Sequence, residues 1–176
     1  MHIVLRRLSV EDDRDVYDML QEIPRDENGY LNGCNGRSFE EYKDWLIKSD
    51  GLAKGENVPE GLVPQTVYWL FADGVPVGMG KLRSRLTEAL RETGGHVGYA
   101  IRPSKRGKGY GKLLLRLLIV EAQGIGVDRM LITIQNHNTP SIRTALSNGG
   151  VVERTDDVRH YIWVACDKTP GGFTAT

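Results

Sequence analysis

The chain has 176 residues, a length typical of a single domain. Its 23 lysines and arginines balance 23 aspartates and glutamates, which argues against a nucleic-acid binder, because such proteins attract phosphates with excess positive charge. Hydrophobic residues make up 40%, which argues against wholesale disorder. No apolar run approaches the ~18 residues of a membrane span, so no membrane partner is expected.

The cysteines and the first residues indicate the compartment. Cys34 and Cys166 lie far apart in the chain and form no metal-ligand pair, so no metal is expected. One disulfide between them is an alternative, but two free thiols fit a reducing environment. Met1–Ser9 reads as a strand with two arginines rather than as a signal peptide. These features predict a cytoplasmic protein.

Helix signals dominate the first third of the chain. Ser9 is followed by acids and predicts a helix N-cap, and the helical spacing of apolar residues continues until Pro24. Ser38 and Glu41 resemble a capping box for a second helix. The predicted order is a strand over Ile3–Ser9, a helix to Pro24, a loop over Arg25–Arg37, a helix to about Gly51 and a loop over Gly51–Gln65.

Strand signals dominate from Thr66 onward. Asp73-Gly74 predicts a hairpin turn, and Thr139-Pro140 predicts a helix N-cap followed by proline. The predicted order is strands over Val67–Phe71 and Val75–Leu82, a partly helical connection over Arg83–Thr93, a strand over Gly95–Arg102, a helix over Tyr110–Gln123, a strand over Met130–Gln135, a helix from Thr139, and a hairpin of Val151–Arg154 with His160–Cys166. The small, polar tail from about residue 168 is expected to fray, and residues 1–176 are expected to form one α/β domain.

One strand–helix–strand unit contains the most informative loop. Gly95–Arg102, Tyr110–Gln123 and Met130–Gln135 are expected to form a right-handed crossover between parallel strands, with ligands beyond the strands' carboxyl ends. The loop at that end, Arg102–Gly111, reads RPSKRGKGYG. Its alternate glycines let backbone N–H groups and the helix dipole reach an anion. The positive side chains around it are Lys105, Arg106, Lys108 and Lys112. Together they predict a site for pyrophosphate or a comparable anion.

This loop has three other possible interpretations. The simplest is a tight turn that binds no ligand. A P-loop would need Ser or Thr after Gly111-Lys112, where Leu113 stands, and an upstream glycine that is missing. A dinucleotide fingerprint needs Gly-x-Gly-x-x-Gly after the first strand, whereas Gly-x-Gly-x-Gly follows several strands here. Both phosphate motifs therefore fail on spacing.

The loop does match Arg/Gln-x-x-Gly-x-Gly/Ala at Arg106, Gly109 and Gly111, and on these residues the sequence resembles the GNAT superfamily of N-acetyltransferases. Further segments, Leu82-Arg83, Leu86, Gly94–Tyr99 and Arg102–Ser104, resemble a bacterial subfamily of predicted acetyltransferases. The resemblance covers most of the chain, because the order of strands and helices also matches. It implies the GNAT (acyl-CoA N-acyltransferase) α/β fold, a mixed central sheet of about six to seven strands with helices on both faces.

The resemblance also implies acetyl-CoA as the co-substrate. Ile101 would offer backbone groups to the pantetheine arm, and nearby lysines would bind the 3′-phosphate. The pyrophosphate would be held by Arg106, Gly107, Lys108, Gly109, Tyr110 and Gly111. Asn138 matches an asparagine that often contacts the cofactor arm, although a plain helix cap explains it equally well. Ser141 is a further candidate contact, with a solvated helix position as the alternative.

Acetyl transfer to an amine needs a base for the ammonium, a polarised thioester carbonyl and an acid for the thiolate. Many family members supply the acid from a Tyr in the last helix, where counting from Asn138 gives Ala145. Tyr99 and Tyr161 are candidates to replace it, with packing as the alternative for both. His96 is the candidate base, because it is expected beside small residues on a strand and its pKa of ~6.5 suits neutral pH. A structural histidine is the alternative, and Glu88 or Glu92 acting through a water are further options.

The predicted function is therefore an N-acetyltransferase that acts by direct attack in a ternary complex on a primary amine of a small molecule or peptide. A non-catalytic acyl-CoA-binding regulatory or sensor module is the alternative. The loops Arg25–Arg37 and Gly51–Gln65 are expected to contact the acceptor. Asp26 and Glu27 hint at a cationic acceptor, although surface acids also serve solubility. A homodimer, frequent in the family, is a further option.

Overall fold

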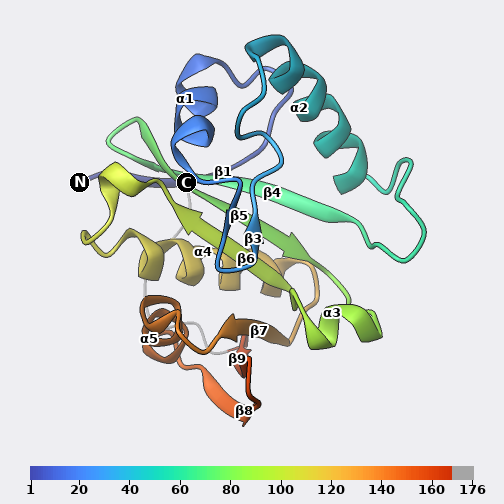
Figure 1. The fold of residues 1–176 in the computed structure, drawn as a ribbon, viewed down its shortest axis with the longest axis vertical. Helices are drawn as coiled ribbons and strands as arrows, with labels where there is room; N and C mark the ends of the chain where they lie inside the picture. The colour runs from blue at the N-terminus through green and yellow to red at the C-terminus, as the bar shows by residue number, and fades with distance from the viewer. Residues whose placement is uncertain (168–176) are drawn as a thin grey trace.

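A computed structural model describes residues 1–167 of the chain (Figure 1). Nine strands and five α-helices are assigned within these residues. Their order is β1 (Ile3–Arg7), α1 (Arg14–Glu22), β2 (Asp26–Glu27), β3 (Tyr30–Leu31), α2 (Phe39–Ala53), β4 (Gln65–Ala72), β5 (Val75–Arg83), α3 (Glu88–Glu92), β6 (Val97–Ile101), α4 (Tyr110–Gly124), β7 (Arg129–Gln135), α5 (Thr139–Ser147), β8 (Val151–Thr155) and β9 (Arg159–Ala165), with a 3-10 turn at Pro103–Lys105. The tail from residue 168, predicted to fray, lies outside the described residues.

Two antiparallel sheets form the centre of the fold. The first has the strand order β1-β4-β5-β6, and the second has the order β7-β9-β8. Asp73-Gly74 makes the predicted tight turn between β4 and β5, with both residues in the left-handed region. The predicted α/β GNAT fold is confirmed, and the two sheets together supply the expected number of strands. β6 and β7, predicted as neighbours in one sheet, instead belong to different sheets.

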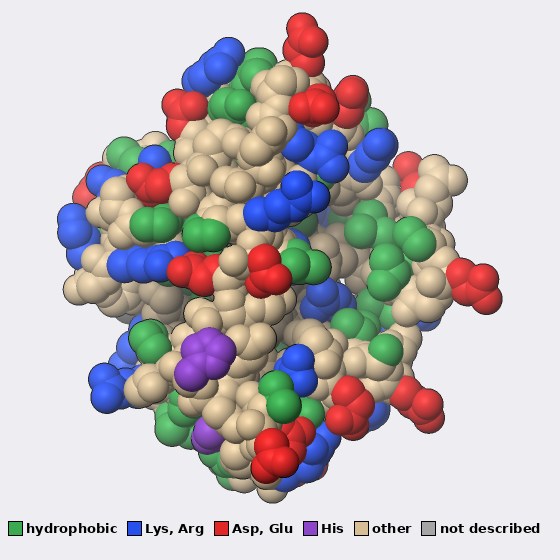
Figure 2. Space-filling model, viewed as in Figure 1, with side chains coloured by type: hydrophobic (Ala, Val, Ile, Leu, Met, Phe, Trp, Pro, Cys, Tyr) green, Lys and Arg blue, Asp and Glu red, His purple; other side chains and the backbone are tan. Residues whose placement is uncertain are grey.

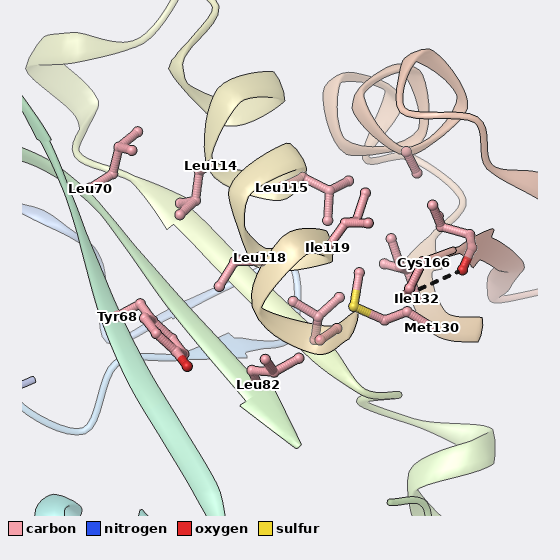
Figure 3. Close-up of a cluster of buried hydrophobic side chains, with 14 of the residues drawn as sticks. Tyr68, Leu70, Leu82, Leu114, Leu115, Leu118, Ile119, Met130, Ile132 and Cys166 are labelled. Atoms are coloured by element: carbon pink, nitrogen blue, oxygen red, sulfur yellow. Dashed lines mark hydrogen bonds between the residues drawn. The ribbon is translucent and has the colours of Figure 1, made fainter. Parts of the chain in front are cut away.

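Helix α4 packs on one face of the first sheet and builds the larger core (Figure 3). Its leucines and Ile119 contact side chains from β4, β5 and β7. The fully or almost fully buried members in that figure are Tyr68, Leu70, Leu82, Leu114, Leu115, Leu118, Ile119, Met130, Ile132 and Cys166. Close packing of α4 on β5 depends on Gly80, because a Cβ there would stand 2.7 Å from a methyl carbon of Leu118. This packing fixes the N-terminus of α4 beside the end of β6.

Helices α1 and α2 cover the opposite face of the first sheet (Figure 1). The predicted capping box of α2 is confirmed, since Ser38 and Glu41 exchange both hydrogen bonds. The predicted Ser9 cap of α1 is wrong, because that helix begins only at Arg14. Asp12 explains the delay: its buried carboxylate accepts from the Trp69 indole at 2.6 Å and from the Ser9 amide at 2.8 Å, which holds this segment as a turn.

The segment predicted as an irregular loop, Arg25–Arg37, contains a two-stranded hairpin. β2 and β3 pair around Asn28-Gly29, and both turn residues have positive φ, as this tight turn requires. Buried Asn32 anchors the following stretch, because its side-chain amide donates to the carbonyl oxygens of Leu20 and Ile23. In Figure 1 the hairpin descends in front of β6, and β3 contacts that strand. The β2–β3 hairpin is thus an ordered element that lies across β6.

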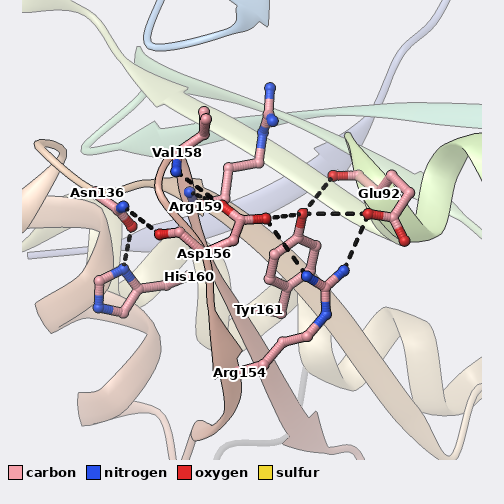
Figure 4. A network of polar contacts seen from close by, with 8 residues as sticks. All are labelled: Glu92, Asn136, Arg154, Asp156, Val158, Arg159, His160 and Tyr161. Atoms are coloured by element: carbon pink, nitrogen blue, oxygen red, sulfur yellow. Dashed lines mark hydrogen bonds and ion pairs between the residues drawn. The ribbon is translucent and has the colours of Figure 1, made fainter.

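The β8–β9 hairpin is fastened to α3 by a polar network (Figure 4). Arg154 forms an ion pair of 3.0 Å with Glu92, and the Tyr161 hydroxyl donates to Asp156 at 2.9 Å. Asp156 also accepts from the backbone amides of Val158 and Arg159, and these bonds lower the pKa of its carboxyl to about 2. The network fixes the second sheet relative to α3.

Both cysteines are free thiols, as the sequence predicted, and the structure shows that both are buried. Within residues 1–167, the search for groups of three or more His, Cys, Asp or Glu side chains able to hold a metal found none. Over the same residues, no helix combines the length and apolar character required to cross a membrane.

Candidate functional site

A cleft of about 560 Å³ lies where the two sheets separate. Its walls come from the outer edge of β6, the end of β7, the first turns of α4 and α5, and the β2–β3 hairpin. The residues that line it include Glu27, Tyr30, Gly94, Gly98, Tyr99, Ile101, Arg106, Gly107, Gly109, Gly111, Asn138, Ser141 and Thr144. The cleft therefore contains the glycine loop and the free edge of a strand.

The separation of β6 from β7 begins at His96. The His96 amide donates to the Leu131 carbonyl at 2.9 Å, and the Leu131 amide donates to Nδ1 of the His96 ring at 2.9 Å. The preceding residue must be glycine, because a Cβ on Gly95 would stand 2.4 Å from the Leu131 carbonyl oxygen. Beyond this joint the strands belong to different sheets and the cleft opens between them.

This geometry argues against His96 as the catalytic base. Its ring is 7% exposed, its Nδ1 is occupied by a backbone amide, and the cleft lining, over the described residues, does not include it. Burial, together with the charges of Arg91 and Arg83, lowers the pKa of His96 to about 4. The alternative interpretation, a structural histidine that joins the two sheets, fits these contacts.

The variant His96→Gln tests whether the hydrogen bonds between His96 and Leu131 serve stability rather than catalysis. We expect turnover to stay within about threefold, because a residue outside the reacting groups affects rate only through the fold. The free energy of unfolding should fall at pH 7.5. As pH falls from ~6.5 towards 4, the unfolded parent binds a proton that folded His96 does not, so the parent loses stability. Urea unfolding at pH 7.5 and pH 5 should show the gap between parent and variant narrowing by about 1–2 kcal/mol. A variant with parental stability but severely reduced turnover would instead restore His96 as the base.

The glycine loop is shaped to admit an anion. Gly107 and Gly109 adopt φ values of 76° and 79°, and no atom lies within 4 Å of a Cβ built on either one. α4 begins directly afterwards at Tyr110, and the first N–H groups of a helix have no partner within the helix. These groups and the positive end of the helix dipole point to the same space. Lys105 and Lys112 line it, whereas Lys108 does not.

Arg106 has a different partner from the one its motif suggests. Its guanidinium forms a bidentate ion pair with Glu27 of the hairpin, at 2.9 and 2.5 Å, and its Nε donates to the Ile101 carbonyl at 3.0 Å. An anion at the loop would have to share Arg106 with Glu27 or displace it. No local sequence pattern indicates this ion pair, because 79 residues separate Glu27 from Arg106.

The two acids that hinted at a cationic acceptor are already engaged. Asp26 accepts from the Gly29 amide at 3.1 Å within the hairpin turn, and Glu27 pairs with Arg106. The hairpin is also tied to the other side of the cleft, where Asn28 Oδ1 lies 2.8 Å from Nε2 of His137. Of the two predicted acceptor loops, Arg25–Arg37 does line the cleft. No residue of the other loop, 51–65, is among the described residues that line the cleft.

Tyr99 brings a hydroxyl into the cleft beside α5. Its Oη lies 2.9 Å from Oγ of Ser141, and burial raises the pKa of Tyr99 to about 12, so the hydroxyl keeps its proton at neutral pH. Ala145, the position reached by counting to the family's tyrosine, instead lies in the core and is fully buried. Thr144 faces the cleft in its place.

The remaining catalytic candidates lie elsewhere. Tyr161 and Glu92 take part in the network beside β8, and Glu88 lies in α3. None of the three lines the cleft formed by the described residues. Every predicted cofactor-binding residue except Lys108 does line it, and Asn138 also caps α5 by accepting from the Ser141 amide at 3.4 Å. Glu27 and Tyr30, which belong to the predicted acceptor loop, line the cleft, and Thr144 is a lining residue that the sequence did not indicate.

Comparison with solved structures supports this interpretation of the fold. An acetyltransferase of the GNAT family from Streptococcus pneumoniae is 16% identical, with 93% of this chain and 99% of that chain covered and a TM-score of 0.63. The N-acetyltransferase PseH from Campylobacter jejuni, in complex with acetyl coenzyme A, is 14% identical with the same coverage and TM-score. A Salmonella typhimurium acetyl transferase that modifies the N-terminal serine of ribosomal protein L7/L12 is 15% identical, with 92% of each chain covered and a TM-score of 0.62.

Family membership rests on a separate comparison. No curated protein sequence is significantly similar to this chain. The model of the Acetyltransferase (GNAT) family matches residues 16–149, well over half of the chain. The match spans α1 to the end of α5 and includes the glycine loop and both strands that flank the cleft. The chain therefore belongs to the GNAT family of acetyltransferases.

Proposed function

We propose that this protein transfers the acetyl group of acetyl-CoA to a primary amine of a small molecule or peptide, by direct attack in a ternary complex. The observation that carries the proposal is the single cleft that joins the anion-binding loop to the free edge of β6. Membership of the GNAT family gives acetyl-CoA as the co-substrate. The Salmonella neighbour's action on an N-terminal serine supports a peptide amine as one acceptor class.

The residues of the cleft fit acetyl-CoA from its phosphates to its thioester. The open glycine loop and the α4 N-terminus would hold the pyrophosphate, with Lys105 and Lys112 adding positive charge. The outer edge of β6 near Ile101 would pair with the pantetheine arm, because this edge has no ladder partner among the described strands. Asn138 and Ser141 line the facing wall. Together they form a track from phosphate to strand.

Bound acetyl-CoA supplies an activated acetyl thioester. The neutral acceptor nitrogen forms a bond to the acetyl carbon and gives up one proton to solvent, while the C–S bond breaks and the sulfur gains one proton. Tyr99 is the residue of this chain placed to hold that proton, since its protonated hydroxyl lies in the cleft beside Ser141. Tyr99 of β6 would thus replace the tyrosine that many family members carry in the last helix, where this chain has Ala145. The assignment of Tyr99 as the acid does not depend on the role of His96.

A thioester-cleavage assay with a panel of amines, run beside calorimetric titration with acetyl-CoA, tests the proposal. We expect acetyl-CoA to bind and CoA to be released only when an amine is present. Binding without acceptor-dependent release would favour the non-catalytic acyl-CoA-binding module. Absence of binding would contradict both functions.

Two features support the wider setting of this proposal. Both core clusters pack on the same four-stranded sheet, which favours a single domain over the whole chain. The free, buried thiols of Cys34 and Cys166 favour a reducing, cytoplasmic location.

A further inference from the structure

One polar atom of the cleft is buried without a partner. The ring of Tyr30 enters the cleft from β3 and lies against β6, where a Cβ on Gly98 would stand 3.1 Å from it. Among the described residues, its hydroxyl has no hydrogen-bond partner although it is shielded from solvent. Burial raises the pKa of Tyr30, so the hydroxyl is a neutral donor. An unsatisfied buried donor is uncommon and points to a missing ligand group.

A nearly unpaired cation lies behind the same wall. Within residues 1–167, the guanidinium of Arg83, at the end of β5, makes one hydrogen bond, from Nη1 to the Gly95 carbonyl at 3.2 Å. No carboxylate of residues 1–167 forms an ion pair with it. Nη1 stands 3.8 Å from the place of a Cβ on Gly94, and Gly94 is part of the cleft wall. Buried guanidinium groups are normally paired with carboxylates or phosphates.

Lys81 adds a second positive charge on the same face of β5, two residues before Arg83. Its Nζ lies 4.8 Å from the centroid of the Tyr30 ring and donates to the Leu31 carbonyl. No ion pair to Lys81 is formed by the carboxylates of the described chain. Burial and the charge of Arg83 lower the pKa of Lys81 to about 8, as expected for two neighbouring cations that are partly removed from solvent.

Three acids of the β2–β3 hairpin and α3 have other partners. Glu27 pairs with Arg106, Asp26 caps the hairpin turn, and Glu92 pairs with Arg154. Arg83 and Lys81 therefore lie directly behind this end of the cleft wall, beside the unpaired Tyr30 hydroxyl, and no carboxylate of residues 1–167 forms an ion pair with either cation. Figure 2 shows Lys or Arg side chains within the hollow on this face.

We propose that the acceptor amine carries a carboxylate, which the Arg83 guanidinium and the Tyr30 hydroxyl bind at the β5–β6 end of the cleft. The inference rests on the proposed acetyltransferase function and specifies its substrate class. A planar guanidinium matches a carboxylate through two parallel hydrogen bonds, and the Lys81 charge strengthens the attraction. The same contact would orient the amine of the acceptor relative to the cofactor arm, since Gly98 and Tyr99 follow directly along β6.

Matched pairs of amines test this substrate class. The ω-amino acids from glycine to 6-aminohexanoate are compared with n-alkylamines of the same chain length, using CoA release with saturating acetyl-CoA. We expect kcat/KM for the best amino acid to exceed that of its alkylamine partner by at least about tenfold, the usual scale of one charge-assisted contact. Calorimetric titration of the same amino acids into the CoA-saturated protein measures binding separately from turnover.

Variants then locate the contact. Arg83→Gln and Tyr30→Phe should reduce the carboxylate preference, Arg83→Gln to about one, while acetyl-CoA affinity changes less than about twofold. Arg85→Gln is the matched control, because it removes the same charge from an exposed position two residues away. Arg83→Lys should retain part of the preference, which separates loss of charge from loss of fold.

Each outcome has a definite consequence. An Arg83→Gln variant that keeps the parental preference, or a parent that favours alkylamines, overturns the inference. Absence of carboxylate-dependent binding and turnover with every amino acid of the series overturns it as well. Amine-dependent CoA release without carboxylate preference leaves the acetyltransferase function intact, whereas failure to bind acetyl-CoA at all removes that function.

Discussion

Replacing Gly109 by Asp is expected to abolish acetyl-CoA binding while the protein remains folded. The new carboxylate would stand at the start of α4, where the helix dipole and the first N–H groups favour an anion. It would occupy the open space required by the pyrophosphate and repel its charge. We expect the dissociation constant measured by calorimetry to rise at least about 100-fold, because a fixed negative charge replaces a favourable anion site.

The backbone of Gly109 adds a cost that the control must match. Its φ of 79° is unfavourable for other residues, so the substitution should lower stability by about 1 kcal/mol. Gly126→Asp is the matched control, because Gly126 has φ of 83°, no atom lies within 4 Å of its added Cβ, and it follows the other end of the same helix. Similar melting temperatures but unequal affinities would locate the effect at the loop. Equal acetyl-CoA affinity in the two folded variants would remove the anion-site assignment.

The sequence predicted the parts of the cleft that depend on short-range patterns. Alternate glycines before an amphipathic helix define the loop, and the βαβ order places that loop at the end of β6. The helix α4 was predicted almost to its observed limits, because most of its leucines face the core, with Leu114, Leu115 and Leu118 fully buried. These features follow from local geometry and need no knowledge of distant partners.

The errors arose where distant residues decide the local structure. Asp12 is drawn towards the Trp69 indole, 57 residues away, and the predicted Ser9 cap is lost. The His96 ring accepts from the Leu131 amide across the two sheets, a contact that argues against the predicted base and that no local pattern indicates. In both cases a polar side chain satisfies a buried backbone or ring group, and such pairings leave no periodic signal in the sequence.

The hairpin β2–β3 was missed for another reason. Its strands have two residues each, too short for an alternating pattern, although Asn28-Gly29 carries the turn signal. Its importance comes from the residues it brings to the cleft, Tyr30 and Glu27. Only the structure shows that Glu27 meets the loop arginine, so the acids could not be assigned to the acceptor or excluded from it beforehand.

Tyr99→Phe is expected to lower turnover by about 100-fold, the lower end of the range for a positioned acid or base. The substitution removes only the hydroxyl, whose proton is retained at neutral pH because burial raises the pKa of Tyr99 to about 12. The ring still packs against the core through the same strand position. Acetyl-CoA affinity should remain within about fivefold, since the lost hydrogen bond to Ser141 is worth only about 1 kcal/mol.

Tyr161→Phe provides the matched control for this experiment. Tyr161 is also a buried tyrosine with a hydrogen-bonded hydroxyl, but its partners are Asp156 and Glu92 in the network beside β8. Its phenylalanine variant should lose stability without losing turnover. Ser141→Ala should show an intermediate loss, because Ser141 only positions the Tyr99 hydroxyl, from which it lies 2.9 Å. Steady-state CoA release, acetyl-CoA titration and melting temperature are measured for all three variants. Parental turnover in Tyr99→Phe would show that Tyr99 serves packing alone and that water protonates the departing thiolate.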